Sequence, residues 1–149
     1  MRKKVLVIED EKIDALRIGR VISQQFPGVS LEILTTGEQA LDWLQRFRTD
    51  DAVLQLVLMD LTIPRVHGLE LLSEFKRNEL VKDVPIVVLS GNEDPEAIRI
   101  AYSSGAFGYV VKPATAAEMA TTLASVLDFW LNLNRVTVPA RVAQRSPSG

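Results

Sequence analysis

Side chains able to bind a metal ion or a phosphate group follow four short apolar runs in this chain. They are two adjacent carboxylates, a third carboxylate, a hydroxyl and a lysine, in chain order Glu9, Asp10, Asp60, Ser90 and Lys112. Carboxylates that lie close together repel unless a hard cation sits between them, and Mg²⁺ prefers such oxygen ligands. A metal ion and a lysine can neutralise a phosphoryl group while a carboxylate supplies the nucleophile. These residue types therefore suit a phosphoryl group, provided that the fold brings them together.

The elements that must position these groups are short strands. The stretch Leu54–Asp60 is nearly all apolar and too short for a helix, which predicts a strand covered on both faces. The predicted strands are Val5–Ile8, Leu31–Leu34, Leu54–Asp60, Pro85–Leu89 and Gly108–Val111. Helical spacing between them predicts an α/β fold with five helices on both faces of a five-stranded parallel sheet. We expect the flavodoxin-like order 2-1-3-4-5, in which strands 1 and 3 flank the ligand site.

Several helix boundaries are marked by residues with defined capping roles. Thr36 and Thr115 are expected to cap the second and fifth helices. Pro95 suits the first turn of the fourth helix, and Gly105 suits its C-terminal cap. The two carboxylates after the first strand would also cap the first helix through its dipole. Asp60 could likewise serve only to cap the turn after its strand.

Composition limits the classes of partner. The 149 residues suffice for one domain, and 17 basic against 19 acidic side chains give no general attraction to nucleic acid or membrane. The absence of cysteine excludes disulfides, thiolate metal sites and a thiol nucleophile. The first apolar run is too short for a signal core or a membrane span. We expect a soluble cytoplasmic protein in which residues 1–133 form the domain and residues 134–149 a partly disordered extension.

Four motifs at the strand ends together resemble the receiver domain of two-component response regulators. They are Val7–Asp10, Leu58–Pro64 with Gly68–Leu72, Pro85–Ser90, and Gly105–Pro113. Each motif is weak alone, but all four occur in the family's order across nearly all of residues 4–133. The resemblance implies a phosphoryl group taken from a sensor histidine kinase. It also implies a change in the surface around the fourth helix, fifth strand and fifth helix, for partner binding or phosphorelay.

The resemblance implies roles for the residues of a metal site with Mg²⁺ as the cofactor. Asp60 would be the phosphoacceptor and would also contact the ion. Asp10 would bind Mg²⁺ directly, and Glu9 would act either through a bound water or by contacting a direct ligand. Thr62 would complete the set of protein ligands with its backbone carbonyl.

A second group would bind the phosphoryl group and report its presence. By the same resemblance, Lys112 would pair with the phosphate and Ser90 would turn toward it. Tyr109 would be the aromatic residue that follows Ser90 inward. Gly91, next to Ser90, is small enough to leave the approach of the phosphate open.

The C-terminal end narrows the resemblance. Phe129–Leu131 followed by Val136–Pro139 is similar to the single-domain response regulators that work with bacterial and cyanobacterial phytochromes. The stretch Glu70–Leu72 lacks the arginine-bearing version that is typical of that group. A phytochrome is therefore one candidate for the partner kinase.

Surplus apolar surface is expected at the end of the last helix. Its predicted core stripe is Met119, Leu123, Val126, Leu127 and Trp130. Phe129 and Leu133 fall outside this stripe, and a contiguous exposed patch usually marks a partner. Either the segment Val136–Pro139 folds back over it or a second copy covers it. We expect a homodimer through Phe129, Trp130, Leu133, Val136 and Val138.

Two other function classes compete with a signalling switch. A small phosphatase would use an aspartate nucleophile with serine and lysine helpers, but such enzymes generally carry a second aspartate two residues later, where this chain has Thr62. Without an acid for the leaving group, turnover of phosphate esters is not expected. A flavodoxin-like cofactor binder would need hydroxyls and amides in its first loop, whereas Glu9 and Asp10 would repel a phosphate. The switch is the preferred hypothesis.

Overall fold

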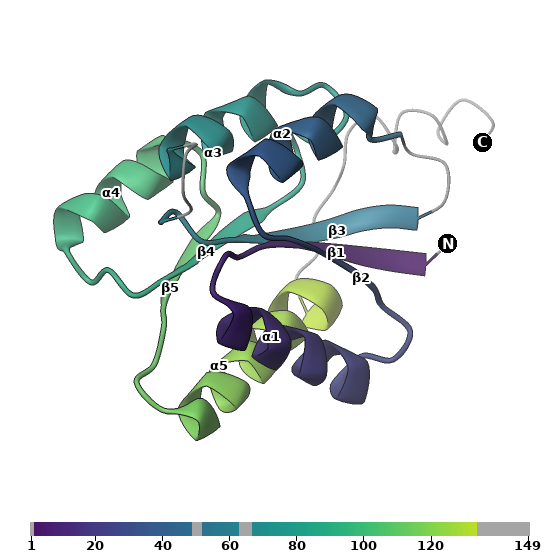
Figure 1. Cartoon of the computed structure of the whole chain (residues 1–149), viewed down its shortest axis with the longest axis vertical. Coiled ribbons are helices and arrows are strands. Elements are labelled where there is room, and N and C mark those ends of the chain that lie inside the picture. Colours follow the sequence, from purple (N-terminus) through teal and green to yellow (C-terminus); the bar gives the residue numbers. More distant parts are fainter. Residues whose placement is uncertain (1, 49–51, 63–66, 134–149) are drawn as a thin grey trace.

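A single parallel sheet forms the centre of the protein. The computed structural model describes residues 2–48, 52–62 and 67–133 (Figure 1). The strands are β1 Arg2–Ile8, β2 Ser30–Leu34, β3 Ala52–Met59, β4 Ile86–Ser90 and β5 Gly108–Val111. All neighbouring strands run parallel, in the order β2-β1-β3-β4-β5. The predicted fold class and strand order are confirmed.

Helices cover both faces of this sheet. They are α1 Lys12–Gln25, α2 Gly37–Arg46, α3 Gly68–Arg77, α4 Pro95–Ser103 and α5 Ala116–Asp128. Figure 1 shows α1 and α5 on one face and α2, α3 and α4 on the other. Within the described ranges, no helix is both long and apolar enough to cross a bilayer.

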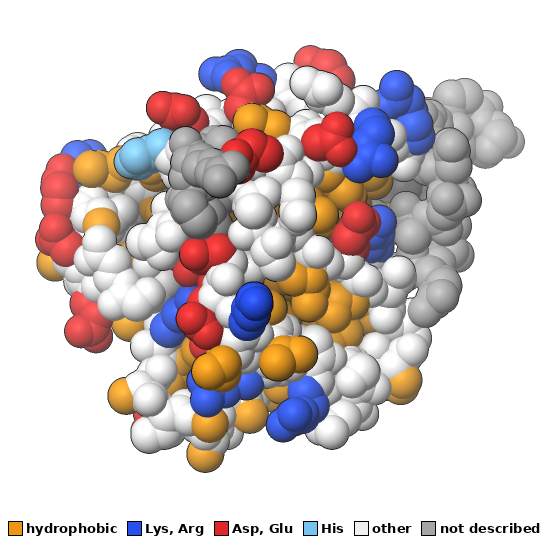
Figure 2. Space-filling view, in the orientation of Figure 1, with side chains coloured by type: hydrophobic (Ala, Val, Ile, Leu, Met, Phe, Trp, Pro, Cys, Tyr) orange, Lys and Arg blue, Asp and Glu red, His pale blue; other side chains and the backbone are white. Residues whose placement is uncertain are grey.

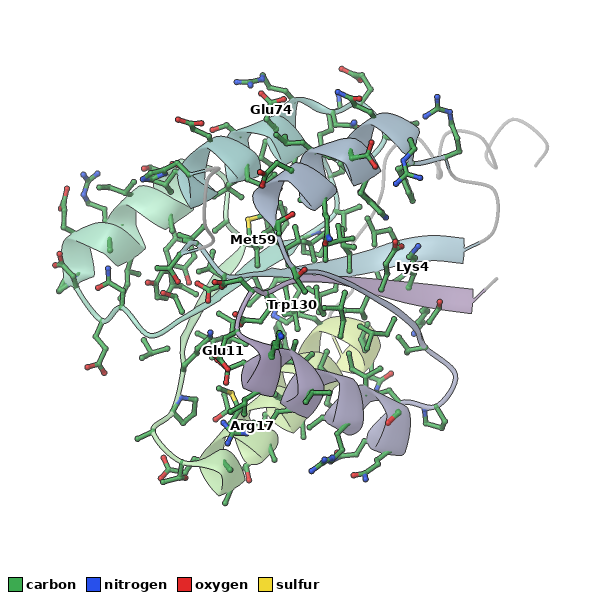
Figure 3. All side chains as sticks on the ribbon, in the orientation of Figure 1. Lys4, Glu11, Arg17, Met59, Glu74 and Trp130 are labelled. Carbon is green, nitrogen blue, oxygen red and sulfur yellow. The ribbon has the colours of Figure 1, made fainter. Side chains whose placement is uncertain are left out.

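The central strand β3 is buried on both faces, as its sequence predicts. Leu56 and Leu58 pack with residues of α1 and α5, whereas Val57 and Met59 pack with residues of α2, α3 and α4. Figure 3 shows Met59 on the α2 and α3 side of the sheet. These four side chains are at most 2% exposed, and each fully buried one stabilises the fold by about 1.5–3 kcal/mol. The residue that follows, Asp60, is thereby held at a rigid edge.

Most of the predicted helix boundaries are confirmed. Thr36 and Thr115 accept hydrogen bonds from the backbone of the third residue after each, at 3.1 Å and 3.2 Å. Pro95 opens α4, and Gly105, just past its end, has a φ of 115°, a conformation that favours glycine. The N-cap of α1 is Glu11, which was not predicted and accepts from the Ile13 N–H at 2.9 Å. Glu9 accepts from the Glu11 N–H at 3.1 Å, so it lies at the start of this helix as expected.

The end of the last helix also differs from the prediction. A π-helical turn, η1 Phe129–Leu133, follows α5. Leu131 is 3% exposed, whereas Val126 and Trp130 are only partly buried. Val126 and Trp130 still pack against the core, as predicted, but Leu131, which was not predicted, is the fully buried residue at this end of the stripe. A π turn closes its hydrogen bonds over five residues, which changes the residue that faces the sheet.

Candidate functional site

The carboxyl ends of β1, β3, β4 and β5 lie side by side and bring the predicted residues together. The Asp60 N–H donates to the Ile8 carbonyl at 3.0 Å, which fixes the end of β3 beside that of β1. The Lys112 N–H donates to the Ser90 carbonyl at 2.8 Å, which does the same for β5 and β4. Figure 2 shows acidic and basic side chains together at this edge, where the loop after β1 leads into α1.

Three carboxylates meet at this edge in a geometry that fits a metal ion. One carboxylate oxygen each from Glu9, Asp10 and Asp60 lies within 4.8 Å of the others. Glu9 and Asp60 are buried, at 1% and 5% exposure, and Asp10 is more open to solvent. The buried Oε1 atom of Glu9 has no hydrogen-bond partner. Because a buried oxygen without a partner is costly, its presence among other carboxylates suits a hard divalent cation.

Lys112 lies at the centre of this cluster. Its Nζ atom is 2.8 Å from Glu9 Oε1, a close ion pair that lacks hydrogen-bond geometry. It donates hydrogen bonds to Asp60 Oδ2 and to Asp14 Oδ2, both at 2.9 Å. Burial lowers the pKa of Lys112, but the three carboxylates outweigh it and raise this pKa above its ordinary value. We refer to Glu9, Asp10, Asp14, Asp60 and Lys112 as the acidic site.

Asp14 is the member of the acidic site that sequence reasoning missed. It lies in the first turn of α1, and its side chain is 14% exposed. The same carboxylate is 3.6 Å from Arg17, one turn further along the helix. Its spacing of four residues from Asp10 was the one signal available in the sequence. That signal is weak, because aspartate is common in the first turn of helices.

Asp60 is oriented by the residue two positions later. Its Oδ1 atom accepts hydrogen bonds from the Thr62 N–H at 2.9 Å and from the Thr62 hydroxyl at 2.8 Å. Burial opposes ionisation of Asp60, but these bonds and Lys112 outweigh it and hold its pKa below the ordinary value. The carboxylate is therefore ionised at neutral pH, with Oδ1 occupied by two donors and Oδ2 facing Lys112.

The pKa of Glu9 is shifted in the opposite direction, above its ordinary value. Burial raises its pKa, Lys112 lowers it and the charge of Asp60 raises it, with a net pKa of about 7. The second oxygen, Oε2, accepts from the Glu11 N–H at 3.1 Å, which holds the carboxyl group at the start of α1. Glu9 therefore titrates near neutrality.

Ser90 and Tyr109, which are predicted to sense a phosphoryl group, both form a hydrogen bond with the loop residue Asn92. Ser90 is 1% exposed, and its hydroxyl accepts from the Asn92 N–H at 3.2 Å. The Tyr109 hydroxyl donates to the Asn92 carbonyl at 2.8 Å. A Cβ atom added at Gly91 would meet nothing within 4 Å, so the chain is open to solvent there. Asn92 thus connects Ser90 with Tyr109.

The return of the chain from β3 into α3 requires a glycine. A Cβ atom at Gly68 would lie 2.3 Å from the Leu61 carbonyl oxygen, far inside any real contact. His67 caps α3 by accepting the Leu69 N–H on Nδ1 at 3.3 Å. The close approach of Gly68 to Leu61 fixes the backbone directly after Asp60.

Part of the predicted partner surface forms an aromatic patch, defined by Phe107, Phe129 and Trp130. The Trp130 ring centre is 6.4 Å from that of Phe107 and 5.3 Å from that of Phe129. Phe107 and Phe129 are 48% and 47% exposed. The Leu133 side chain, Val136 and Val138 lie outside the described residues.

The strand order and the charged groups at the strand ends define the class of protein as a CheY-like receiver fold. The chain belongs to the response regulator receiver domain family, whose model matches residues 5–124. The resemblance inferred from the four motifs is therefore confirmed. Receiver-domain response regulators are generally not multiple-turnover enzymes, which disfavours the phosphatase hypothesis.

Relatives cover nearly the full length of the chain. It is 33% identical over 137 residues to the probable methanogenesis regulatory protein FilR2 of Methanothrix harundinacea, covering 91% of this chain and 88% of that protein. It is 29% identical to response regulator Rcp1 of Synechocystis sp., covering 93% and 94%. The Mn²⁺-bound form of Rcp1 has a TM-score of 0.82 at 26% identity, covering 91% and 99%. Response regulator RPA3017 in red light signaling of R. palustris has a TM-score of 0.78 at 30% identity, covering 91% and 99%.

Proposed function

We propose that this protein is a single-domain response regulator that accepts a phosphoryl group on Asp60 from a partner histidine kinase. The observation that carries the proposal is the position of Lys112 Nζ, 2.9 Å from Asp60 Oδ2, beside three carboxylates whose oxygens lie within 4.8 Å. Residues 1–133 would form the receiver domain and residues 134–149 a C-terminal extension. Similarity to RPA3017, a response regulator in red light signaling, supports a light-sensing kinase, and the C-terminal motif favours a phytochrome as the first partner to test.

Asp60 would act through its Oδ2 atom. Oδ1 already accepts two hydrogen bonds from Thr62, so Oδ2 has the more available lone pair. In the transfer, Oδ2 forms a bond to phosphorus and the phosphorus–nitrogen bond of phosphohistidine breaks. The electron pair of that bond stays on the imidazole nitrogen, and the imidazole, protonated on its other nitrogen, leaves neutral. Lys112 would then neutralise the phosphoryl oxygens.

Mg²⁺ would be held by the carboxylates of Glu9, Asp10 and Asp60, with the Thr62 carbonyl as a further ligand. The buried Oε1 atom of Glu9 pairs with the Lys112 ammonium but accepts no hydrogen bond, and this supports the assignment, because a divalent cation would satisfy it. When bound, the ion would supply charge neutralisation for the phosphoryl oxygens. The chain itself contributes the nucleophile, its orientation by Thr62, and the lysine.

Ser90, Tyr109 and Asn92 would transmit phosphorylation to the surface of α4, β5 and α5. A Ser90 hydroxyl that turns toward a phosphoryl group gives up its hydrogen bond from the Asn92 N–H. Tyr109 holds the carbonyl of the same residue, so the loop after β4 and the ring would shift together. Gly91, with open space around its Cβ position, would keep the approach to Asp60 clear. The charge change at Asp60 would thereby bias a two-state surface.

The kinase would dock beside the acidic site on α1. Ile13 and Leu16 are 56% and 68% exposed, and Ile13 directly precedes Asp14 of the acidic site. Large apolar side chains with this exposure near a reactive group favour a protein partner. Leu16→Arg should slow transfer from a phosphorylated kinase and leave transfer from acetyl phosphate unchanged.

A second copy would bind the aromatic patch. Its two exposed rings pack edge-on against Trp130, which gives a contiguous apolar surface at the end of α5. Leu133, Val136 and Val138 would extend this interface. The protein would then be a homodimer through its C-terminal end.

The direct test of the proposed function is labelling with acetyl phosphate. The protein is incubated with Mg²⁺ and acetyl phosphate, and its intact mass is measured. A mass increase of one phosphoryl group is expected, with loss of acetate, and Asp60→Asn should abolish it. An unchanged mass under conditions that label a known receiver domain contradicts the proposal.

A further inference from the structure

We propose that Asp14 is a positioning residue that holds Lys112 over the acidic site while the phosphoryl group is transferred. The inference rests on the proposed function and assigns a role to a residue of α1 that lies outside the strand ends. Asp14 Oδ2 accepts a hydrogen bond from Lys112 Nζ at 2.9 Å. It is the one carboxylate of the acidic site that touches Lys112 and has no part in binding the metal or the phosphoryl group.

Three carboxylates share the ammonium group of Lys112 in this state. Glu9 Oε1, Asp14 Oδ2 and Asp60 Oδ2 lie 2.8 Å, 2.9 Å and 2.9 Å from Nζ. Two of its three N–H donors bond to Asp14 and Asp60, and the ammonium faces Glu9 Oε1 as a close ion pair. The side chains of Lys112 and Asp14 are each 14% exposed, and their contact is therefore only weakly screened by solvent.

Two of the three contacts would change when the site is loaded. A metal ion held beside Glu9 would compete with Lys112 for that carboxylate. A phosphoryl group on Asp60 Oδ2 would replace the carboxylate oxygen by an ester-type oxygen with no full charge. Asp14 would then be the remaining carboxylate partner that stays in place, and it would keep one N–H of Lys112 fixed while the other two turn to phosphoryl oxygens.

The location of Asp14 suits this role. It lies in the first turn of α1, which is capped by Glu11 and packed on the sheet through buried Ala15 and Ile18 (Figure 3 shows Glu11 at the start of this helix). Lys112 lies at the end of β5, so the contact joins two elements far apart in the sequence. A long lysine side chain has many rotamers, and a fixed partner reduces the entropy lost when it binds the phosphoryl group.

The test is a double-mutant cycle on the rate of phosphorylation by acetyl phosphate with Mg²⁺. Asp14→Asn keeps the shape of the side chain but removes its charge, and it should slow phosphorylation of Asp60 by about tenfold, the typical loss of one charge-assisted contact. Lys112→Met should slow the reaction further. In the Lys112→Met background, Asp14→Asn should change the rate by less than about twofold, because its effect acts through the lysine.

Controls separate positioning from general charge and from folding. Arg17→Gln removes the other ionic partner of Asp14 and should leave the rate within about twofold of the parent. Melting temperatures of all variants show whether each one folds. An Asp14→Asn rate equal to or above that of the parent overturns the inference. A slowing that is the same with and without Lys112 also overturns it, since general electrostatics would then explain the effect.

The same experiment distinguishes failure of the inference from failure of the proposed function. If the parent protein is not phosphorylated on Asp60, the proposed function is wrong. If the parent is phosphorylated and Asp14→Asn reacts at the parent rate, the positioning role alone is wrong.

Discussion

Replacing Lys112 by methionine should destabilise the metal-free protein and make its stability depend on Mg²⁺. Methionine fills a similar volume without the charge. The substitution would leave the carboxylates of Glu9, Asp14 and Asp60 facing one another without the ammonium that now lies 2.8–2.9 Å from each. Because the pKa of Lys112 is raised, its contribution to stability is fully present at any pH below the pKa of an unfolded lysine, so the effect should be complete at pH 6–8.

The expected size follows from the burial of the groups. Removing one partner of a buried ion pair typically costs about 3–5 kcal/mol. Two features reduce this cost: Lys112 is 14% exposed, and Glu9, with a pKa of about 7, can take up a proton when the lysine is absent. We expect a loss of about 2–4 kcal/mol at pH 8, a fall of about 6–15 °C in melting temperature for a domain of this size.

The assay is thermal unfolding followed by circular dichroism, in EDTA and over a series of Mg²⁺ concentrations. Mg²⁺ should raise the melting temperature of Lys112→Met by more than that of the parent, because the ion no longer competes with the ammonium for the carboxylates. Lys82→Met is the matched control, since Lys82 forms its ion pair with exposed Glu79, and it should melt within about 2 °C of the parent. A Lys112→Met variant that melts like the parent in EDTA, or gains less from Mg²⁺, refutes this reasoning.

Three further predictions concern other parts of the fold. Gly68→Ala should cost more than about 3 kcal/mol in urea unfolding, because its Cβ atom would lie 2.3 Å from the Leu61 carbonyl oxygen. In EDTA, Glu9→Gln should be more stable than the parent by about 2 kcal/mol at pH 8 and about equally stable at pH 5. The reason is that the pKa of Glu9 is raised to about 7, so its ionisation costs the folded parent stability as the pH rises from 4.5 through 7. Phe129→Asp should shift the protein from dimer to monomer in sedimentation experiments.

Each of these has a matched comparison. Gly91→Ala meets open space at its Cβ and should leave stability nearly unchanged, so equal losses at positions 68 and 91 would contradict the first prediction. For Glu9→Gln, a gain in stability over the parent that shrinks as the pH rises would contradict the second prediction. For the dimer, Tyr102→Asp changes an aromatic residue that is 48% exposed on α4 and outside the aromatic patch; it should leave the association unchanged. A parent that sediments as a monomer contradicts the dimer itself.

The fold was predictable because its signals are local. Each strand is an apolar run that stops at a polar residue, and parallel strands place those stops at one edge. This is why Glu9, Asp60 and Lys112 could be brought together from the sequence alone. The helix caps at Thr36 and Thr115 depend on one side chain and the next turn, so they too were predicted correctly.

The remaining features depend on contacts between distant segments. Asp14 looks like any acidic residue in a first helical turn, and only the folded chain places it 2.9 Å from Lys112. The pKa of Glu9 depends on burial and on two neighbours from other strands. At the end of α5, consecutive apolar residues gave no basis for choosing Leu131 over Trp130 as the buried one, because the choice follows from a π turn.

The measurement that tests the central claim most directly is the chemical identification of the phosphorylated residue. After reaction with acetyl phosphate and Mg²⁺, sodium borohydride reduces an aspartyl phosphate to homoserine, which peptide mass spectrometry can locate. The proposed function predicts homoserine at position 60, only when Mg²⁺ was present, and none in Asp60→Asn. Homoserine at another position, or none at all, contradicts Asp60 as the phosphoacceptor.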